Sequence, residues 1–323
     1  MFQNPSKVAD LAPWWRICYI HGFLEYCTFQ NSSYLRGIKF KTITKMKIQV
    51  LHTGEVRVSP YLPFGGDNCN LLKASGMTTP KEDWIWLPVS VYLIEHPKGL
   101  ILVDTGWHRD MSPEGVYDKA AQIKSLGSRV LYNVNQGQIP LGEAVDEQLA
   151  TMGIKPADLD YVLLTHLDCD HANGLRAVKN AKHIIVAQEE LDCARKNGFI
   201  RYKKKWWEGV DLQTIEWNGT EGPAQKSFDL FGDGSIKMIN IPGHCDGLCA
   251  VKITREDGKY VLLFSDGGYA TKSWKEMITS GVSLDKEMQR KSLMWIREQS
   301  MHPNCIESLA THDTDIKPHV IEL

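Results

Sequence analysis

The sequence predicts an α/β fold in which two similar β-rich halves pack together. From residue 46 onward, short β-rich runs alternate with helical patterns, which is typical of layered α/β proteins. Residues 99–106 and 259–267 resemble each other, because each is an apolar run that ends in an aspartate and a glycine turn. This internal similarity predicts one such strand in each half and a single domain with two β layers.

Each expected element is identified by its residue periodicity. Continuous or alternating apolar runs of a few residues predict strands, whereas apolar residues three and four apart predict helices. The expected strands, in order, are 47–52, 87–95, 100–103, 161–164, 183–187, 236–241, 248–253 and 260–265. The expected helices are 141–152, 188–197 and 285–299. Residues 158–160 mark the loop that enters the strand at 161.

Composition excludes several classes of protein and partner. The chain has 323 residues, of which 43% are hydrophobic and 24% are charged, so it is not collagen-like, low-complexity or wholly disordered. The net charge of −2 provides no basic surface, and we expect no nucleic-acid partner. No apolar run approaches the roughly 18 residues that a membrane span needs, and we expect no membrane association.

The cysteines and the N-terminal sequence indicate the compartment. None of the eight cysteines forms a C-x-x-C pair, and the first residues lack the pattern of a secretory signal. We therefore predict reduced thiols in a cytoplasmic protein rather than a disulfide framework.

Residues 1–45 differ from the rest of the chain. They contain many aromatic residues without steady helical or strand spacing, and Met46 opens the first expected strand. We favour the interpretation that Met46 is the true start and that residues 1–45 are an atypical, poorly ordered segment. The alternative is a packed appendage, such as a lid over the substrate. Residues 46–323 are predicted to form the functional domain.

The segment from Leu163 to His171 carries the most informative chemistry. An apolar run leads directly into four potential metal ligands, His166, Asp168, Asp170 and His171. Imidazole and carboxylate groups suit divalent metals, and a loop at a strand end can direct several of them at one point. Burying four such groups would be costly without a partner, so we predict metal binding rather than a solvated loop.

Three further candidate ligands follow later strands. His244 lies in a glycine-bounded turn after one predicted strand, Asp266 follows another, and His312 lies near the C-terminus. A single histidine of this kind is more often structural or at the surface. Their positions, together with the first cluster, favour metal binding by all three.

These motifs resemble those of the metallo-β-lactamase superfamily, and more closely those of its N-acyl-homoserine lactonase branch. The superfamily signature is H-x-H-x-D-H, followed by a Gly-His turn, a bridging aspartate and a final histidine. Residues 87–94 and 101–106, and the run from Asp266 to Tyr269, match the lactonase branch beyond the metal ligands. The resemblance covers about residues 46–320 and implies a four-layered αββα sandwich, the metallo-β-lactamase fold.

Asp168 departs from the superfamily pattern, which has a histidine at this position. Carried over by position, the resemblance implies two divalent metal ions in a binuclear site. Site one would comprise His166, Asp168 and His244, site two would comprise Asp170, His171 and His312, and Asp266 would bridge them. The family implies zinc, whereas the added carboxylate shifts the preference toward iron or manganese.

The resemblance also implies an activity, namely a metal-dependent hydrolase that opens lactone rings. The expected small-molecule substrates are N-acyl-homoserine lactones, whose hydrolysis would constitute quorum quenching, and a metal-activated hydroxide would attack their carbonyl carbon. Tyr269 would donate a hydrogen bond to the developing oxyanion, unless it is only a half-buried structural tyrosine. Asp170 would return a proton to the leaving alkoxide.

Supporting roles are expected for three other regions. Asp104 follows a strand and either orients the metal-binding loop or caps a turn. Trp84, Trp86 and residues 203–207 are candidates for contacts with an acyl chain, although a solvated basic face with an aromatic residue packed inward is the favoured explanation of the last of these.

The sequence alone leaves other activities open. The same fold supports thioesterases such as glyoxalase II and phosphodiesterases, and Asp168 resembles the carboxylate of the superfamily's di-iron oxidoreductases. The chain has no flavodoxin-like domain and no G-x-G-x-x-G fingerprint, which disfavours the oxidoreductase. The expected assembly is a monomer or a homodimer.

Overall fold

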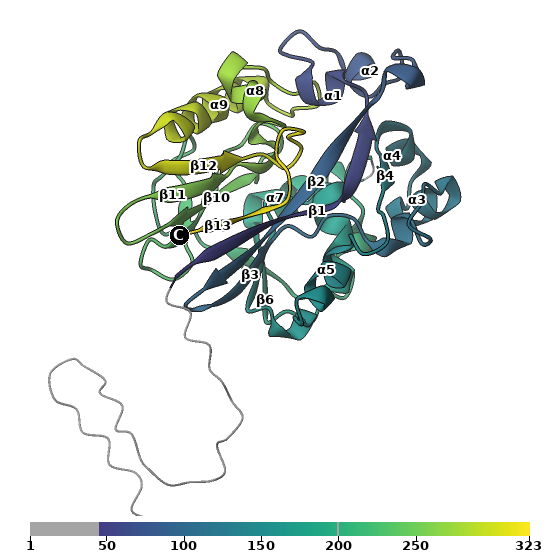
Figure 1. The fold of residues 1–323 in the computed structure, drawn as a ribbon. Coiled ribbons are helices and arrows are strands. Elements are labelled where there is room, and N and C mark those ends of the chain that lie inside the picture. Colours follow the sequence, from purple (N-terminus) through teal and green to yellow (C-terminus); the bar gives the residue numbers. More distant parts are fainter. Residues whose placement is uncertain (1–44, 199) are drawn as a thin grey trace, which may run out of the picture. The chain divides into compact units, whose positions relative to one another are not determined.

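Two β-sheets pack face to face, and helices cover their outer faces (Figure 1). This computed structural model describes residues 45–198 and 200–323. The hypothesis that the N-terminal segment before Met46 is poorly ordered falls outside these residues, apart from Lys45. Among the described residues, no helix is both long and apolar enough to cross a membrane.

The larger sheet contains the strands of the first half of the domain together with the C-terminal strand. Its strand order is β13-β1-β2-β3-β5-β6-β7, and β4 pairs with β1. The bounds are β1 Lys47–Val58, β2 Ile85–His96, β3 Gly99–Val103, β4 Gln136–Gln138, β5 Tyr161–Leu163, β6 His183–Ala187, β7 Leu212–Ile215 and β13 His319–Glu322. Because β3, β5, β6 and β7 are parallel, the loops that follow them lie at the same edge.

The smaller sheet carries the second half. Its strand order is β12-β11-β10-β9-β8, with all pairs antiparallel except β11 and β12, which are parallel. The bounds are β8 Ser227–Asp229, β9 Ile236–Asn240, β10 Cys249–Thr254, β11 Tyr260–Leu263 and β12 Cys305–Leu309.

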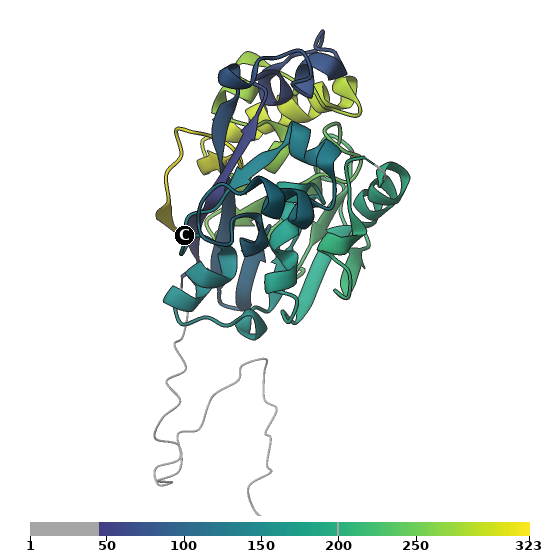
Figure 2. The ribbon, with the colours of Figure 1, turned by 90° about the vertical axis from the view of Figure 1, so that its right-hand side faces the viewer.

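The helices form the two outer layers (Figure 2). The bounds are α1 Tyr61–Phe64, α2 Leu71–Ala74, α3 Lys119–Leu126, α4 Arg129–Val134, α5 Val145–Thr151, α6 Cys169–Ala172, α7 Gln188–Asn197, α8 Thr271–Glu276 and α9 Lys286–Met301. Helix α7 packs against β6 of the larger sheet, and α9 packs against β12 of the smaller one. The predicted four-layered αββα sandwich is therefore confirmed.

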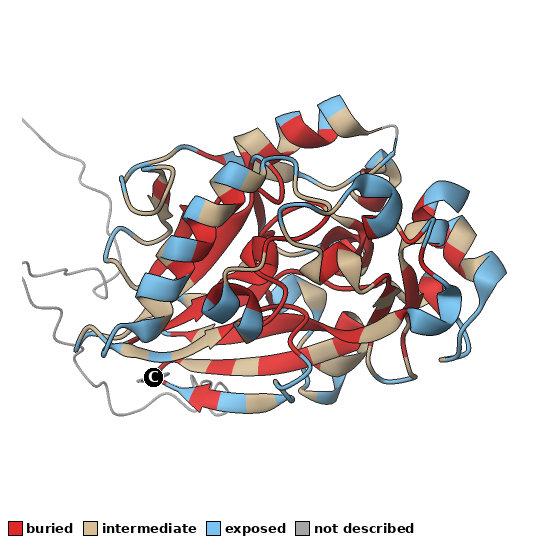
Figure 3. Ribbon diagram, turned by 90° about the horizontal axis from the view of Figure 1, so that it is seen from above, coloured by how far each residue is buried: buried red, intermediate tan, exposed pale blue. Residues whose placement is uncertain are grey.

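Alternation along the strands explains why both faces of each sheet are covered. Tyr92 and Ile94 of β2 belong to the apolar cluster between the sheets, which also contains Val251 of β10. Leu93 points the other way and belongs to the cluster that contains Leu149 of α5. Buried residues consequently dominate the central strands, while the outer strands and the outer faces of the helices carry exposed residues (Figure 3).

All the expected strands and helices are present, but several bounds differ. The first strand continues to Val58 rather than ending at residue 52. The strand predicted over 260–265 ends at Leu263, because Ser265 adopts a left-handed φ of 47°. The helix predicted over 141–152 begins only at Val145, because Gly142 forms a turn with a φ of 87°.

The internal similarity corresponds to β3 and β11, one strand in each sheet. A buried residue with a left-handed backbone lies just beyond each strand: Asp104, with a φ of 58°, directly follows β3, and Ser265, with a φ of 47°, lies two residues after the end of β11. Such a conformation is unfavourable for residues other than glycine and concentrates at functional sites. Both residues lie beside the predicted metal ligands, and the hydroxyl groups of Thr165 and Ser265 lie 2.9 Å apart.

Candidate metal centre

Loops at one edge of the two sheets bring the predicted ligands together. The larger sheet contributes four of them from the loop after β5 and from α6, while the smaller sheet contributes three from the loops after β9, β11 and β12. These seven side chains are His166, Asp168, Asp170, His171, His244, Asp266 and His312. The sequence scatters them over almost half of the chain, so their grouping depends on the packing of one sheet against the other.

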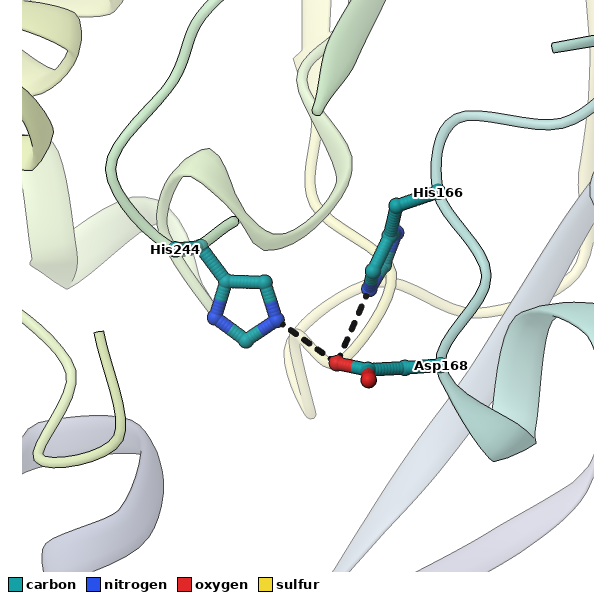
Figure 4. Close-up of side chains that lie close together, drawn as sticks. All are labelled: His166, Asp168 and His244. Atoms are coloured by element: carbon teal, nitrogen blue, oxygen red, sulfur yellow. Dashed lines mark hydrogen bonds and ion pairs between the residues drawn. The ribbon is translucent and has the colours of Figure 1, made fainter. Parts of the chain in front are cut away.

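The first trio consists of His166, Asp168 and His244 (Figure 4). Oδ2 of Asp168 lies 2.9 Å from Nε2 of His244 and 3.4 Å from Nε2 of His166. The three potential ligand atoms lie within 4.8 Å of one another, a spacing at which they could share one cation.

The second trio consists of Asp170, His171 and His312. Oδ2 of Asp170 lies 3.4 Å from Nε2 of His312, and the three potential ligand atoms again lie within 4.8 Å of one another. Both histidines are buried, and Asp170 borders the cavity described below.

Asp266 lies between the two trios and presents one carboxylate oxygen to each. Oδ1 is 3.4 Å from Nε2 of His171 and 3.3 Å from Nε2 of His312. Oδ2 is 4.0 Å from Nε2 of His166 and 3.7 Å from Nε2 of His244. This is the arrangement expected of a carboxylate that bridges two cation sites.

Neighbouring polar groups fix the orientation of three of these histidines. Nδ1 of His171 lies 2.8 Å from Oδ2 of Asp104, and Nδ1 of His312 lies 2.8 Å from the carbonyl oxygen of Pro88. Both acceptors require a proton on Nδ1, so in the neutral ring the lone pair is on Nε2, the nitrogen that faces Asp266. Nδ1 of His166 lies 3.0 Å from the hydroxyl oxygen of Thr165, which itself donates to Asp104.

The buried atoms around Asp266 suit a divalent cation. Among the described residues, Nε2 of His166, His171 and His312 and Oδ1 of Asp266 are buried and accept no hydrogen bond. Buried polar atoms normally have a partner, because leaving them without one costs free energy. Imidazole nitrogen with carboxylate oxygen is also a donor set that divalent transition metals favour.

Arg201 was not predicted as part of the site, yet it contacts the first trio. Its Nε and Nη2 atoms donate to Oδ1 and Oδ2 of Asp168 over 2.7 and 2.6 Å, and Nη2 also lies 2.6 Å from Nε2 of His244. Nη1 donates to the backbone carbonyl of His244 over 3.0 Å. The one sequence signal was Asp168 itself, since a carboxylate in place of a buried imidazole requires a compensating positive charge.

The charges around the first trio shift its protonation. Burial opposes the ionisation of Asp168, but the charge of Arg201 holds the pKa of this carboxyl group well below its usual range. Burial and the charge of Arg201 together lower the pKa of His244 to about 4, so this imidazole is neutral at physiological pH.

A cavity of about 460 Å³ opens onto both trios. Asp168, Asp170, Asp266 and Arg201 lie at its polar end. Its remaining wall is mostly apolar and includes Val56, Val58, Leu62, Leu71, Val130, Leu131, Val134, Ile200, Val282 and Leu284. Trp84, Trp86 and residues 203–207 do not belong to this wall, so the structure does not support their predicted contact with an acyl chain; Trp206 is instead buried in an apolar cluster.

Tyr269 lies where the cavity meets the predicted ligands. It is buried, lines the cavity, and stacks on the ring of His312 with centroids 5.1 Å apart. Burial and the carboxylates of Asp266, Asp168 and Asp170 raise the pKa of Tyr269 well above its usual value. Its hydroxyl group therefore keeps its proton and can donate a hydrogen bond.

Known proteins that are similar in sequence to this chain include two N-acyl homoserine lactonases. The N-acyl homoserine lactonase AttM of Rhizobium radiobacter is 26% identical over 202 residues, which cover 60% of this chain and 70% of the relative. The N-acyl homoserine lactonase of Bacillus cereus is 26% identical over 246 residues, which cover 75% of this chain and 87% of the relative.

Solved structures share the fold. An N-acyl homoserine lactone hydrolase with N-hexanoyl-L-homoserine at its catalytic metal centre superposes with a TM-score of 0.64 at 22% identity, covering 83% of this chain and 94% of the other. AidC, a dizinc quorum-quenching lactonase, superposes with a TM-score of 0.55 at 14% identity, covering 83% and 88%. Residues 84–262, more than half of the chain, match the family description of the metallo-beta-lactamase superfamily. The chain belongs to the metallo-beta-lactamase superfamily.

Proposed function

We propose that this protein is a metal-dependent lactonase that opens the ring of N-acyl-homoserine lactones. The observation that carries the proposal is the position of Asp266, which presents one oxygen to each trio at the polar end of an apolar cavity. This arrangement combines a cation site for a carbonyl group with a channel for a hydrocarbon chain. The relationship to N-acyl homoserine lactonases supports the same activity.

The residues around Asp266 would hold the metal. Asp170, His171 and His312 form a complete set with Oδ1 of Asp266, and their orphaned nitrogen atoms fit a divalent ion. The family pattern would place a second ion at His166, Asp168 and His244, the last two of which also contact Arg201. We propose zinc, which histidine-rich sites of this kind favour, with iron or manganese as the metals that Asp168 would favour. A bound divalent ion supplies Lewis acidity and makes water a nucleophile near neutral pH.

Tyr269 would stabilise the transition state. Tyr269 lines the cavity and its ring stacks on that of His312, so its protonated hydroxyl would meet a lactone carbonyl that enters beside the predicted ligands. A hydrogen bond to the developing negative charge on that oxygen lowers the barrier more than it stabilises the ground state.

Asp170 would move the proton. Its carboxylate lies at the polar end of the cavity, next to His312. Attack of water on the carbonyl carbon releases one proton, and breakage of the ring ester bond creates an alkoxide that needs one. Asp170 is positioned to accept the proton that the water releases and to deliver it to the alkoxide. The product is then the open hydroxy acid, and the carboxylate of Asp170 returns to its initial state.

The apolar wall of the cavity would bind the acyl chain. Val58, Leu62 and Leu131 are buried around it, and each buried methylene of a chain contributes about 0.8 kcal/mol. This lining favours a neutral amphipathic substrate over a phosphodiester. The cytoplasmic location, the monomeric or homodimeric state and the division into residues 1–45 and 46–323 stay predictions from sequence.

A substrate panel tests the proposal. The purified full chain, loaded separately with zinc, manganese and iron, is assayed on acyl-homoserine lactones, a simple γ-lactone, a thioester and bis-p-nitrophenyl phosphate. We expect the highest kcat/KM on the acyl-homoserine lactones with at least one of these metals. Thioester or phosphodiester turnover far above lactone turnover would overturn the lactonase, and oxygen-dependent chemistry of the iron form alone would favour an oxidoreductase.

A further inference from the structure

The guanidinium group of Arg201 lies where a cation bound by the first trio of potential ligands would lie. Nη2 is 2.6 Å from Oδ2 of Asp168 and 2.6 Å from Nε2 of His244. These are two of the three potential ligand atoms of that trio. The same nitrogen atom therefore already contacts the acceptors that a metal ion at site one would need.

Arg201 and a metal ion would compete for the same lone pairs. A guanidinium group only donates hydrogen bonds, so Nε2 of His244 is the acceptor in its 2.6 Å contact with Nη2, and its 2.9 Å approach to Oδ2 of Asp168 is then not a hydrogen bond but a contact mediated by the shared guanidinium donor. A neutral imidazole has a single accepting nitrogen with one lone pair, which cannot accept a hydrogen bond and bind a metal at once. The paired donors of Arg201 also engage both oxygen atoms of Asp168.

Arg201 is anchored in this position. Nη1 donates to the carbonyl oxygen of His244 over 3.0 Å, and the guanidinium carbon lies 5.4 Å from the ring centroid of Tyr202, which is buried. The side chains of Arg201 and Asp168 are only 17% and 15% exposed, so separating them would leave an unpaired charge in a poorly hydrated place. The guanidinium group stays charged at any physiological pH, which repels a divalent ion from the same spot.

The second trio contrasts with the first. Nε2 of His171, Nε2 of His312 and Oδ1 of Asp266 have no hydrogen-bond partner among the described residues. No described basic side chain forms an ion pair with Asp170 apart from His312, itself a predicted ligand. Nε2 of His166 in the first trio also lacks a partner, but Arg201 engages the other two ligand atoms of that trio, whereas no arginine or lysine contacts the ligand atoms of the second trio among the described residues. The two sites are thus unequal.

We infer that Arg201 takes the place of a metal ion at site one, so that the protein binds one divalent ion, at site two. This inference rests on the metal dependence proposed above but not on the identity of the substrate. Arg201 then provides a fixed positive charge in the cavity wall beside Asp168. It is a positioning residue for Asp168 and His244, which it holds through hydrogen bonds.

Metal stoichiometry tests the inference without reference to turnover. The full chain is stripped with a chelator, incubated with excess Zn²⁺ or Mn²⁺, desalted, and analysed for metal and protein content. We expect about one ion per chain in the wild type and about two in Arg201→Ala, in which Asp168 and His244 are free to coordinate. The matched control is Arg201→Lys, which retains the positive charge and should stay near one ion per chain.

Electron paramagnetic resonance of the Mn²⁺ form of the wild type gives a readout that does not depend on the folding of a variant. One isolated ion gives an uncoupled Mn²⁺ signal, whereas two ions bridged by Asp266 give a signal altered by spin coupling. Two ions per wild-type chain, or a coupled signal, would overturn the inference. So would a folded Arg201→Ala protein that still binds one ion. If the wild type binds about one metal ion per chain but does not hydrolyse lactones, only the proposed function is contradicted.

Discussion

The carboxylate of Asp104 accepts the Nδ1 proton of His171 across 2.8 Å, from a backbone position with a φ of 58°. The same carboxylate accepts hydrogen bonds from the backbone N–H and the hydroxyl group of Thr165. Asp104 thereby connects the end of β3 to the loop that carries four of the predicted ligands. It both fixes the tautomer of His171 and restrains that loop. These partners lie in the metal-binding loop rather than in the turn of Asp104 itself, which corresponds to the orienting role and not to the turn-capping one.

Asp104→Asn should weaken metal binding while leaving the backbone in place, since asparagine tolerates a left-handed conformation. Loss of the charged acceptor makes Nε2 of His171 a poorer ligand, and we expect the affinity for the first bound ion to fall about 10- to 100-fold. Competition with a chromophoric chelator measures this affinity. Asp257→Asn, which removes an exposed carboxylate paired with Arg255, is the control and should leave the affinity unchanged. Equal affinities in wild type and Asp104→Asn would contradict this role.

Tyr269→Phe should separate catalysis from metal binding. The phenol contacts His312 only through its ring, and the variant keeps that ring, so the metal content should not change. Loss of one oxyanion donor typically lowers kcat about 100- to 1000-fold, and we expect a decrease of this order on a lactone substrate. Steady-state kinetics together with metal analysis checks both parts. An unaltered kcat would assign Tyr269 to packing alone.

Val130→Trp should shorten the acyl chain that the protein accepts. Val130 lines the cavity and is 58% exposed, so a larger side chain can be placed there with little disturbance of the core. If it displaces about two methylenes of a long chain, KM for that substrate should rise about tenfold, with little change for a short-chain lactone. The matched control is Val116→Trp, since Val116 is also 58% exposed but does not line the cavity. A parallel change in both variants, or for both chain lengths, would count against the cavity as the acyl site.

His52 should make the folded state sensitive to mild acid. Burial, with smaller contributions from Lys317 and His319, lowers the pKa of His52 from 6.5 to about 4. Below pH 6.5 the unfolded chain gains a proton that the folded chain does not, so the free energy of unfolding falls progressively until about pH 4. In His52→Gln the part of this fall in the free energy of unfolding that comes from His52 should disappear. Urea unfolding of both proteins between pH 7 and pH 4 measures the difference, and identical pH slopes would contradict it.

The parts of the site whose residues are contiguous in the sequence could be predicted more directly than the parts whose residues are far apart in it. The run from His166 to His171 is contiguous, so its chemistry is visible without any knowledge of the fold. His244, Asp266 and His312 are recognisable only because each follows a strand end and matches a family pattern. Their convergence requires the two sheets to pack, and this follows from the alternating apolar residues of the strands.

The contribution of Arg201 could not be predicted in the same way. It lies after α7 in a stretch with several basic residues, and nothing in its local sequence distinguishes it from a solvated arginine. Only the tertiary fold places it against Asp168. The strands β4, β7, β8, β12 and β13 were missed for a related reason, since runs of three to five residues rarely establish a periodicity. Their pairing partners, rather than their own sequences, define them.

Lactone hydrolysis before and after metal removal tests the central claim most directly. The full chain is assayed on an N-acyl-homoserine lactone as purified, after exhaustive chelation, and after reloading with a single type of divalent ion, with Asp266→Ala treated in parallel. We predict ring opening that disappears on chelation, returns on reloading, and is absent from Asp266→Ala at every stage. Hydrolysis that persists in the stripped wild type, or that survives in Asp266→Ala, would contradict a lactonase built on this metal centre.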